Sequence, residues 1–407
     1  MVRGVASLIV VSTAWALYLG CASTGSGGPG TGGAGGVAGT GGTLRDAGGD
    51  AACADPAEKR CGSACVGVND PFYGCGPNTC EPCALANAGM ETCENDQCAL
   101  VNCLGDFQDC DCQPSNGCET QATFCSAAAG AFDPGPAQDV RVDAVSVYWS
   151  TSDGIRKKDK AGGQAVTVVS GQDAPARFAI DATTVFFTTH VAGTVMKADF
   201  ASGSAVPLAS GQDSPIWIAL DATRVYWINA GSTSTPGSVM AIDKTGGSPT
   251  VLASGQSAPE GIAVDESFVY FSLGDGNQVM KVAKTGGSPS VVAAGAANPG
   301  DLAVDSVNVY WVAYAGEALA VPKQGGTVVK LAEGLEYPFA IAVDEANVYF
   351  TTQGRGSCRG TVMRVGTTGG GAQALATSQK EPLSIAVDAT TVYWTSSIDR
   401  SIMSAPK

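Results

Sequence analysis

Histidine is almost absent from this sequence, because His190 is the only one among its 407 residues. No Gly-x-Ser-x-Gly nucleophile motif accompanies it, and a lone loop histidine is more often solvated than catalytic. Basic residues are also scarce: 23 Lys and Arg stand against 38 Asp and Glu, which gives a net charge of -15. Nucleic acids attract clustered Lys and Arg, so we expect no nucleic-acid partner. We also expect no cofactor and no bound metal.

A hydrophobic run long enough to span a membrane is missing as well. The apolar run Val5–Leu19 follows Arg3, and its length is too short for a spanning helix but typical of a secretory signal. We therefore assign residues 1–20 to a signal peptide. The protein is expected to be exported.

The signal ends in the segment Leu19-Gly20-Cys21-Ala22-Ser23, which resembles the lipobox of bacterial lipoproteins. That resemblance implies cleavage before Cys21 and attachment of lipid to it. Two or more acyl chains anchor a protein stably where one does not. By the sorting rule of that family, Ala22 implies the outer membrane of a Gram-negative bacterium. Ordinary secretion without a lipid is the alternative.

Two segments separate Cys21 from the rest of the chain. Residues 21–52 are dominated by Gly, Ala, Ser and Thr, which cannot form a core and indicate a flexible tether. Residues 53–120 are assigned to a small module held by disulfides, because an exported segment this small lacks the apolar mass to fold unaided. Twelve cysteines lie in this module and one follows it, and together they are Cys53, Cys61, Cys65, Cys75, Cys80, Cys83, Cys93, Cys98, Cys103, Cys110, Cys112, Cys118 and Cys125.

The cysteine count raises a question about Cys358. Thirteen cysteines between positions 53 and 125 is an odd number, and Cys358 is the only cysteine beyond them. Adding it allows seven pairs. We hypothesise that Cys358 is bonded to the cysteine-rich module; a lone or intermolecular cysteine is the alternative. A zinc site is disfavoured, because Cys80 and Cys83 lack a second matched pair.

Aromatic residues are few, 7% of the chain, and many of them belong to one repeated phrase. Two or three apolar residues precede an Asp, and three variable residues then lead to Val and two aromatics. The repeated aspartates, 38 to 44 positions apart, are Asp143, Asp181, Asp221, Asp265, Asp305, Asp344 and Asp388. This period is typical of propeller blades. The sequence predicts an all-β, seven-bladed β-propeller over residues 121–407.

Each repeat is expected to contain four strands. The apolar segment before Asp predicts the innermost strand, the Val-aromatic-aromatic segment predicts the second, and a Gly-Gly turn separates the third and fourth. The Asp is expected to fix the turn after the first strand, and a Pro is expected to end the blade. The last copy lacks a fourth strand, so we predict that Ala122–Ala127 completes it.

The apolar-Asp turn, the Tyr-Trp strand and the Gly-Gly turn together resemble the YWTD and NHL families of propellers. The resemblance covers residues 137–407. The acidic residue that follows Trp in YWTD repeats is absent from Trp394-Thr395-Ser396. Those families usually form six blades, so a six-bladed ring is the alternative to seven.

Binding residues are predicted where the repeats differ, because loops on a rigid scaffold usually carry function. The longest connections between second and third strands are Ile228–Ser238 and Thr351–Thr361, and the latter includes Arg355 and Arg359. On the same face, the first strands begin with dissimilar side chains. The candidate ligand-face residues are Arg177, Trp217, Glu260, Asp301, Phe339, His190, Arg355 and Arg359.

These observations leave three functions open. The leading interpretation is a membrane-anchored scaffold that binds a protein or a glycan. A second is a metal-dependent lyase or lactonase. Resemblance to streptogramin-lyase-like propellers implies a His, a Glu and a divalent metal, a role open to His190 and Glu260. Lactonase propellers hold calcium at the axis, where only Asp301 and Glu260 offer carboxylates. The third is a structural envelope protein.

Overall fold

The computed structural model describes residues 58–61, 64–67, 83, 85, 88–94, 97–103 and 131–407, without 233–234 and 355–357. Every regular element in these ranges is a β-strand. Among the same residues no helix has the length and hydropathy needed to cross a membrane. The predicted signal peptide, Cys21 and the tether lie outside the described residues, so these assignments stay predictions, as do the domain boundaries.

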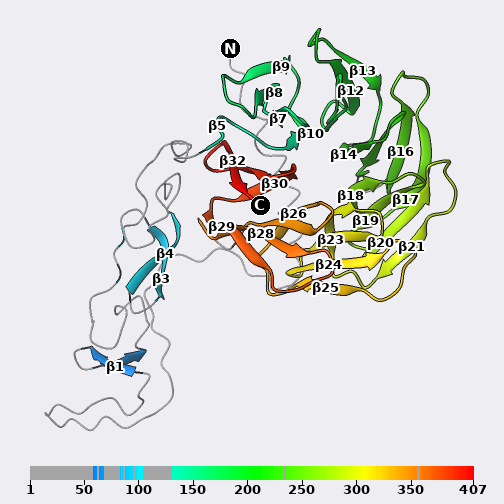
Figure 1. Cartoon of the computed structure of the whole chain (residues 1–407). Helices are drawn as coiled ribbons and strands as arrows, with labels where there is room; N and C mark the ends of the chain where they lie inside the picture. The colour runs from blue at the N-terminus through cyan, green and yellow to red at the C-terminus, as the bar shows by residue number, and fades with distance from the viewer. Residues whose placement is uncertain are drawn as a thin grey trace, which may run out of the picture. The chain divides into compact units, whose positions relative to one another are not determined.

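Seven four-stranded antiparallel sheets form the propeller (Figure 1), which confirms the seven-bladed prediction and excludes the six-bladed alternative. The first blade contains β6 (Val140–Val142), β7 (Ser146–Ser150), β8 (Gly154–Asp159) and β9 (Val166–Ser170). The second contains β10 (Pro175–Ile180), β11 (Thr184–Thr189), β12 (Thr194–Asp199) and β13 (Ala205–Ala209). The third contains β14 (Pro215–Leu220), β15 (Arg224–Asn229), β16 (Gly237–Asp243) and β17 (Thr250–Gln256).

The remaining blades repeat this pattern. The fourth contains β18 (Pro259–Val264), β19 (Phe268–Leu273), β20 (Gln278–Ala283) and β21 (Ser290–Ala294). The fifth contains β22 (Pro299–Val304), β23 (Asn308–Ala313), β24 (Glu317–Pro322) and β25 (Val329–Ala332). The sixth contains β26 (Pro338–Val343), β27 (Asn347–Thr352), β28 (Gly360–Gly366) and β29 (Gln373–Gln379). The seventh contains β30 (Pro382–Val387), β31 (Thr391–Ser396), β32 (Ser401–Pro406) and β5 (Asp133–Pro134).

The first strand of each blade is innermost, as predicted, and lies beside the first strand of the next blade around the ring. The core lies between blades, where the two aromatic residues of each repeated phrase are buried. Trp227, for example, packs with Phe186 of the preceding blade. The proline expected to end each blade instead begins the inner strand of the next, as Pro175 does in β10. Its missing N–H suits the first residue of a strand.

Ring closure uses a segment ahead of the first repeat, but not the predicted one. Asp133 and Pro134 form β5 and pair with β32 at Ile402 and Ser401, whereas Ala122–Ala127 lies outside the described residues. The correction has a physical reason: the closing strand is only two residues long, too short to show a strand pattern. Side chains assist it, because the Phe132 ring meets Tyr393 edge-on at 5.6 Å and lies 4.9 Å from Lys158 Nζ.

The repeated aspartates fix turns, as predicted. In the third blade, Asp221 Oδ1 accepts hydrogen bonds from the backbone N–H groups of Thr223 and Arg224, both at 2.8 Å. The other six aspartates accept the equivalent pair of bonds. The second oxygen of Asp221 accepts the Tyr226 hydroxyl at 2.8 Å. The Asp and the Tyr of the phrase are thus joined within one blade.

A lysine from the next blade extends this arrangement between blades. Lys284 Nζ lies 2.6 Å from Asp221 Oδ2 and 5.6 Å from the centre of the Tyr226 ring. We call the five such ion pairs the inter-blade belt: Lys160–Asp388, Lys244–Asp181, Lys284–Asp221, Lys323–Asp265 and Lys407–Asp344. Phe200 and Thr367 stand at the equivalent positions of blades two and six.

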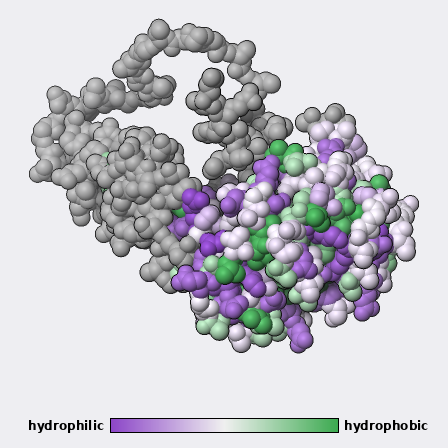
Figure 2. Space-filling model, turned by 90° about the horizontal axis from the view of Figure 1, so that it is seen from above, coloured by the Kyte–Doolittle hydropathy of each residue, from purple (hydrophilic) through white to green (hydrophobic). Residues whose placement is uncertain are grey.

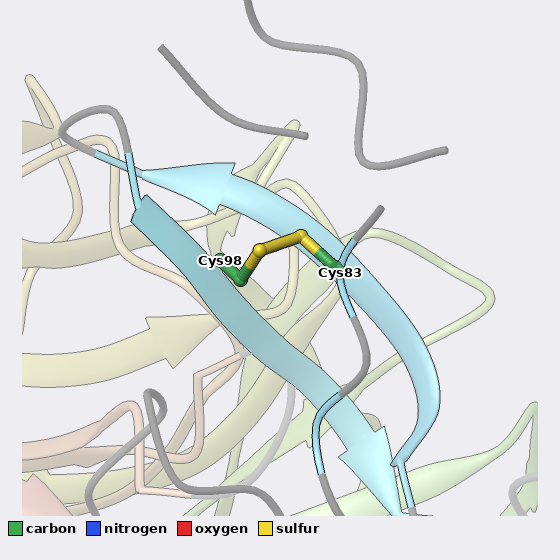
Figure 3. Close-up of a disulfide and its surroundings, with 2 residues drawn as sticks. All are labelled: Cys83 and Cys98. Atoms are coloured by element: carbon green, nitrogen blue, oxygen red, sulfur yellow. A yellow bond between two sulfur atoms is a disulfide. The ribbon is translucent and has the colours of Figure 1, made fainter. Parts of the chain in front are cut away.

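Two short hairpins precede the propeller in the chain: β1 (Glu58–Cys61) with β2 (Ala64–Gly67), and β3 (Ala88–Glu94) with β4 (Gln97–Cys103). A disulfide joins Cys83 to Cys98 of β4 (Figure 3), with 5.6 Å between the Cα atoms. Cys93 takes part in a disulfide, and so does Cys358. All other cysteines of the chain stand at position 125 or earlier. Assignment of the Cys358 partner to the cysteine-rich module stays a prediction.

Candidate ligand-binding site at the axial channel

A β-bulge in the inner strands selects which side chains reach the axis. In β10 the pairing moves from Pro175 with Thr189 to Phe178 with Phe187, so two residues of the inner strand face one of its neighbour. The same shift follows the proline of every later blade. Bulges re-aim side chains and are frequent beside functional sites. The residue at the end of each bulge, directly before the next aliphatic residue, is therefore a candidate for contact with ligand.

These residues form what we call the axial ring. Going around the propeller they are Asp139, Arg177, Trp217, Gly261, Asp301, Ala340 and Ser384. Five of the seven line a cavity of about 300 Å³ at the axis, and Arg141 lines it too. The seven blades thus share one backbone geometry but present seven different environments to the centre.

Asp139 is the hub of the ring and is completely buried. Its Oδ1 accepts hydrogen bonds from Arg141 Nη1 at 2.8 Å, Arg177 Nη1 at 3.2 Å and Ser384 Oγ at 2.6 Å. Its Oδ2 accepts the backbone N–H of Phe178 at 3.1 Å. Burial alone would raise the pKa of Asp139, but the charges of Arg141 and Arg177, together with the hydrogen bonds from Ser384 and Phe178, hold that pKa below its usual value. The carboxylate therefore stays charged.

Aromatic rings orient both guanidinium groups. Arg177 lies 4.1 Å from the centre of the Trp217 ring and 5.9 Å from that of Phe339. Arg141 lies 5.6 Å from the centre of the Phe178 ring. Arginine is attracted to aromatic faces in this range. The stacking leaves the arginines fixed in direction before any ligand arrives.

Asp301 is the second carboxyl group of the axial ring, and its hydrogen bonds differ from those of Asp139. Its Oδ1 accepts the backbone N–H of Leu302 at 2.9 Å and its Oδ2 that of Ile341 at 3.0 Å. No arginine of the described chain donates to it directly. Burial raises the pKa of Asp301 to about 6, against the opposing attraction of Arg177. A carboxyl group with a pKa this far from its usual range is a sign of a functional site.

Glu260 forms a second perturbed carboxyl group nearby. Its Oε2 accepts the Tyr314 hydroxyl at 3.0 Å. The pKa of Glu260 is raised to about 7. Burial is the largest cause, the bond from Tyr314 opposes it, and the charges of Asp275 and Asp301 add to it. Glu260 stands at the first bulge position of blade four, one residue before the axial ring, as Phe339 does in blade six. Both residues therefore flank the ring.

Part of the cavity wall is aliphatic. In five blades the residue that follows the axial-ring position is Ile or Leu. Ile218, Ile262, Leu302, Ile341 and Ile385 line the cavity from five blades. The lining therefore combines charged and aliphatic side chains, a combination that suits a ligand with one polar and one apolar end.

The remaining candidates lie in the connections between second and third strands. His190 follows β11, and its Nδ1 is buried without a hydrogen-bond partner in the described chain. Arg359 lies in the connection that leads to β28, while Arg355 falls among the residues that the structure does not describe. Neither His190 nor Arg359 is among the residues that line the axial cavity.

The residues do not fit the metal site implied by lyase-like propellers. His190 belongs to blade two and Glu260 to blade four, so they do not come from adjacent blades. In the described ranges no group of three or more His, Cys, Asp or Glu side chains could hold a metal ion. The His and Glu types are present in the sequence, but the topology does not bring them to one metal.

The sequence interpretation missed Asp139, Ser384 and Tyr314 and did not count Arg141 as a site residue. A signal existed for Arg141, because it replaces the alanine found at this inner-strand position in the other six copies. Asp139 escaped notice because the first repeat has Ala137 where the others have proline. The bulge then has no sequence marker in that blade.

The outer surface offers less than the channel. Exposed valines occur singly on the outer strands of blades one to five, at Val166, Val206, Val251, Val291 and Val329. On the face drawn in Figure 2, hydrophobic residues are separated by hydrophilic ones. Scattered surface hydrophobics of this kind need no functional explanation.

Comparison with known proteins supports the fold. No protein-family model and no curated protein match the sequence. A streptogramin B lyase structure aligns over 69% of this chain and 95% of its own, at 14% identity and a TM-score of 0.56. A catalytically inactive virginiamycin B lyase from Staphylococcus aureus, solved with quinupristin, aligns over 68% and 96%, at 12% identity and a TM-score of 0.56. The computationally designed Ika8 protein aligns over 70% and 99%, at 15% and 0.52.

The seven four-stranded sheets define the class of the protein as a seven-bladed β-propeller, and the likenesses support that fold. At such low identity they show the fold alone. The same fold supports enzymes and binding proteins, so function has to be argued from the site.

Proposed function

We propose that this chain is an exported, lipid-anchored binding protein whose propeller recognises a protein or a glycan at the axial ring. One observation carries the proposal: blades with the same bulge present different side chains to one cavity of about 300 Å³. A repeated scaffold with a varied centre is suited to selective binding, because the scaffold holds the varied residues rigidly.

The electrostatic order of the ring supports binding more than catalysis. Asp139, Arg141 and Arg177 are bonded to one another. Ser384 also donates its hydroxyl to Asp139, but a carboxylate whose pKa is held below its usual value is a weak base for activating that hydroxyl. The metal-dependent lyase or lactonase is disfavoured because, among the described residues, no group of three or more His, Cys, Asp or Glu side chains could hold a metal ion.

Binding can be tested by screening the mature full-length protein against peptide and glycan arrays. Ligands of the axial ring should be lost on Trp217→Ala, which removes the surface under Arg177, and kept on His190→Ala. A ligand whose binding is unchanged by Trp217→Ala but lost on His190→Ala would contradict the proposal and favour the metal-dependent lyase or lactonase.

The anchor can be tested separately. Metabolic labelling with a fatty acid should mark the wild-type protein in the membrane fraction and fail to mark Cys21→Ser. Release of the unlabelled variant, with its array ligand still bound, would separate anchoring from recognition. Equal labelling of both proteins would refute lipid attachment at Cys21.

A further inference from the structure

We propose that the axial ring binds the C-terminal carboxylate of a peptide that ends in an apolar residue, with Arg141 and Arg177 donating to the carboxylate. This inference rests on the proposed function, because it names the ligand chemistry of the same site.

The first support is a surplus of hydrogen-bond donors. Each guanidinium carries five N–H groups. Arg141 uses Nη1 for Asp139 and for the Val140 carbonyl at 2.7 Å, and Arg177 uses Nη1 for Asp139. In the part of the chain that the structure describes, nothing accepts from Nε or Nη2 of either arginine. Both residues line the cavity, so these donors are available to a ligand.

The second support is the engagement of the neighbouring acceptors. Asp139 is surrounded by four donors. Asp301 uses both oxygens for backbone N–H groups. Two arginines and two aspartates carry no net charge together. The arginines nevertheless have more N–H donors than these two aspartates accept. An incoming carboxylate supplies two acceptor oxygens in the planar geometry that guanidinium prefers.

The third support is the aliphatic wall. Ile218, Ile262 and Ile341 stand directly after axial-ring positions and line the same cavity as the two arginines. A cavity of about 300 Å³ lies at the low end of ligand sites and suits a single residue better than an extended chain. An acidic sugar also carries a carboxylate, but its hydroxyls would lack partners against this wall. A peptide terminus with an aliphatic side chain satisfies both ends.

The test uses fluorescence anisotropy on the mature full-length protein. The probes are labelled hexapeptides from the array that end in Val, Leu or Ile, each made with a free carboxylate and with a C-terminal amide. The amide form should bind at least about tenfold more weakly, because charge-assisted bonds to arginine are the strong ones. Arg177→Gln and Arg141→Gln should weaken the carboxylate form to the level of the amide form.

Two variants keep the result interpretable. Arg364→Gln removes an arginine that contacts Gln373 on the outer part of blade six, and binding should be unchanged. Arg177→Lys keeps the charge near Asp139 but removes the planar fork, so binding should be intermediate. Unfolding midpoints show whether the variants of Arg141 and Arg177 are still folded. A folded Arg177→Lys variant with full affinity would contradict the need for a planar guanidinium group.

The outcomes separate this inference from the function it rests on. Equal affinity for acid and amide peptides, still lost on Trp217→Ala, would overturn the carboxylate while leaving ring binding intact. Binding of a glucuronate-terminated oligosaccharide but of no peptide, lost on Arg177→Gln, would replace the peptide by a glycan and overturn the inference. No binding of any peptide or glycan would overturn both.

Discussion

The inter-blade belt and the axial ring are built from the same blades but follow opposite rules. In the belt, one contact is repeated: a lysine of one blade meets the Asp and lies over the aromatic ring of the previous one, five times around the propeller. In the ring, equivalent positions hold Asp139, Arg177, Trp217, Asp301 and Ser384. Regular residues join blades, and irregular ones face a shared cavity.

Removal of a belt carboxylate should have the largest effect on stability. Asp221→Ala leaves two backbone N–H groups, the Tyr226 hydroxyl and the Lys284 ammonium without their acceptor. Partly buried donors without acceptors predict a loss of about 3 kcal/mol in the free energy of unfolding. Denaturant unfolding measures it. Asp243→Ala is the matched control, because Asp243 is 67% exposed, and its cost should stay below about 0.5 kcal/mol.

Ring closure should come next in size. Phe132→Ala removes the edge-on contact with Tyr393 and the ring beside Lys158 Nζ. Because Phe132 is half-buried, we expect a loss of about 2 kcal/mol. Thermal unfolding of Phe132→Ala and of Val166→Ala, an exposed outer-strand valine, compares a closure residue with a neutral one. Equal unfolding midpoints for the two variants would contradict a stabilising role of the β5 segment in ring closure.

The two regions should also respond oppositely to pH. Glu260 has a pKa raised to about 7 and Asp301 to about 6, so the folded protein holds these protons longer than the unfolded chain does. Their stabilising effect is complete below the unfolded value of about 4 and is lost as pH rises through 6 and 7. Stability should therefore fall as the pH rises from about 4 to 7. Glu260→Gln should flatten that slope; an unchanged slope would rule Glu260 out.

At low pH the belt should decide the outcome. Burial opposes ionisation of Asp265 and Asp344, but bonds from Lys323 and Lys407 lower the pKa of each to about 2. Their contribution is present above about pH 4 and is lost as pH falls through 2. Glu260→Gln should leave this loss of stability at low pH unchanged. A change in the pH at which stability is lost would show that the two regions are coupled.

The smallest predicted effect sharpens the belt by completing it. Thr367 stands where five other blades have lysine, and the nearby Asp305 accepts Tyr310 but no lysine of the following blade. Thr367→Lys should add an ion pair and about 0.5 kcal/mol of stability, the size expected of a partly exposed pair. Thr367→Met keeps the length without the charge, and an equal gain from it would assign the effect to packing.

The fold was predictable because its determinants are local. Asp221 and Tyr226 stand five residues apart, so turn, strand and blade period are all visible in one phrase. The belt was harder, since Lys284 and Asp221 meet across 63 positions and pair only once the order of blades is known. A clue was present in the recurrent lysine before the Gly-Gly turn.

The site was only half predictable for the same reason. Arg177, Trp217 and Asp301 stood out as unusual residues after a proline, and the structure brings all three to one cavity. Glu260 and Phe339 were grouped with them by residue type, but the bulge places them one position earlier. Asp139 lies 245 residues from Ser384, a pairing that exists only because blades one and seven close the ring.

One paired measurement tests the division between belt and ring most directly. Arg177→Gln and Asp221→Ala are each assayed for affinity toward a wild-type array ligand and for the unfolding midpoint. We expect Arg177→Gln to lose binding with little change in midpoint, and Asp221→Ala to lower the midpoint while the folded protein still binds. A folded Arg177→Gln variant with wild-type affinity would contradict recognition at the axial ring.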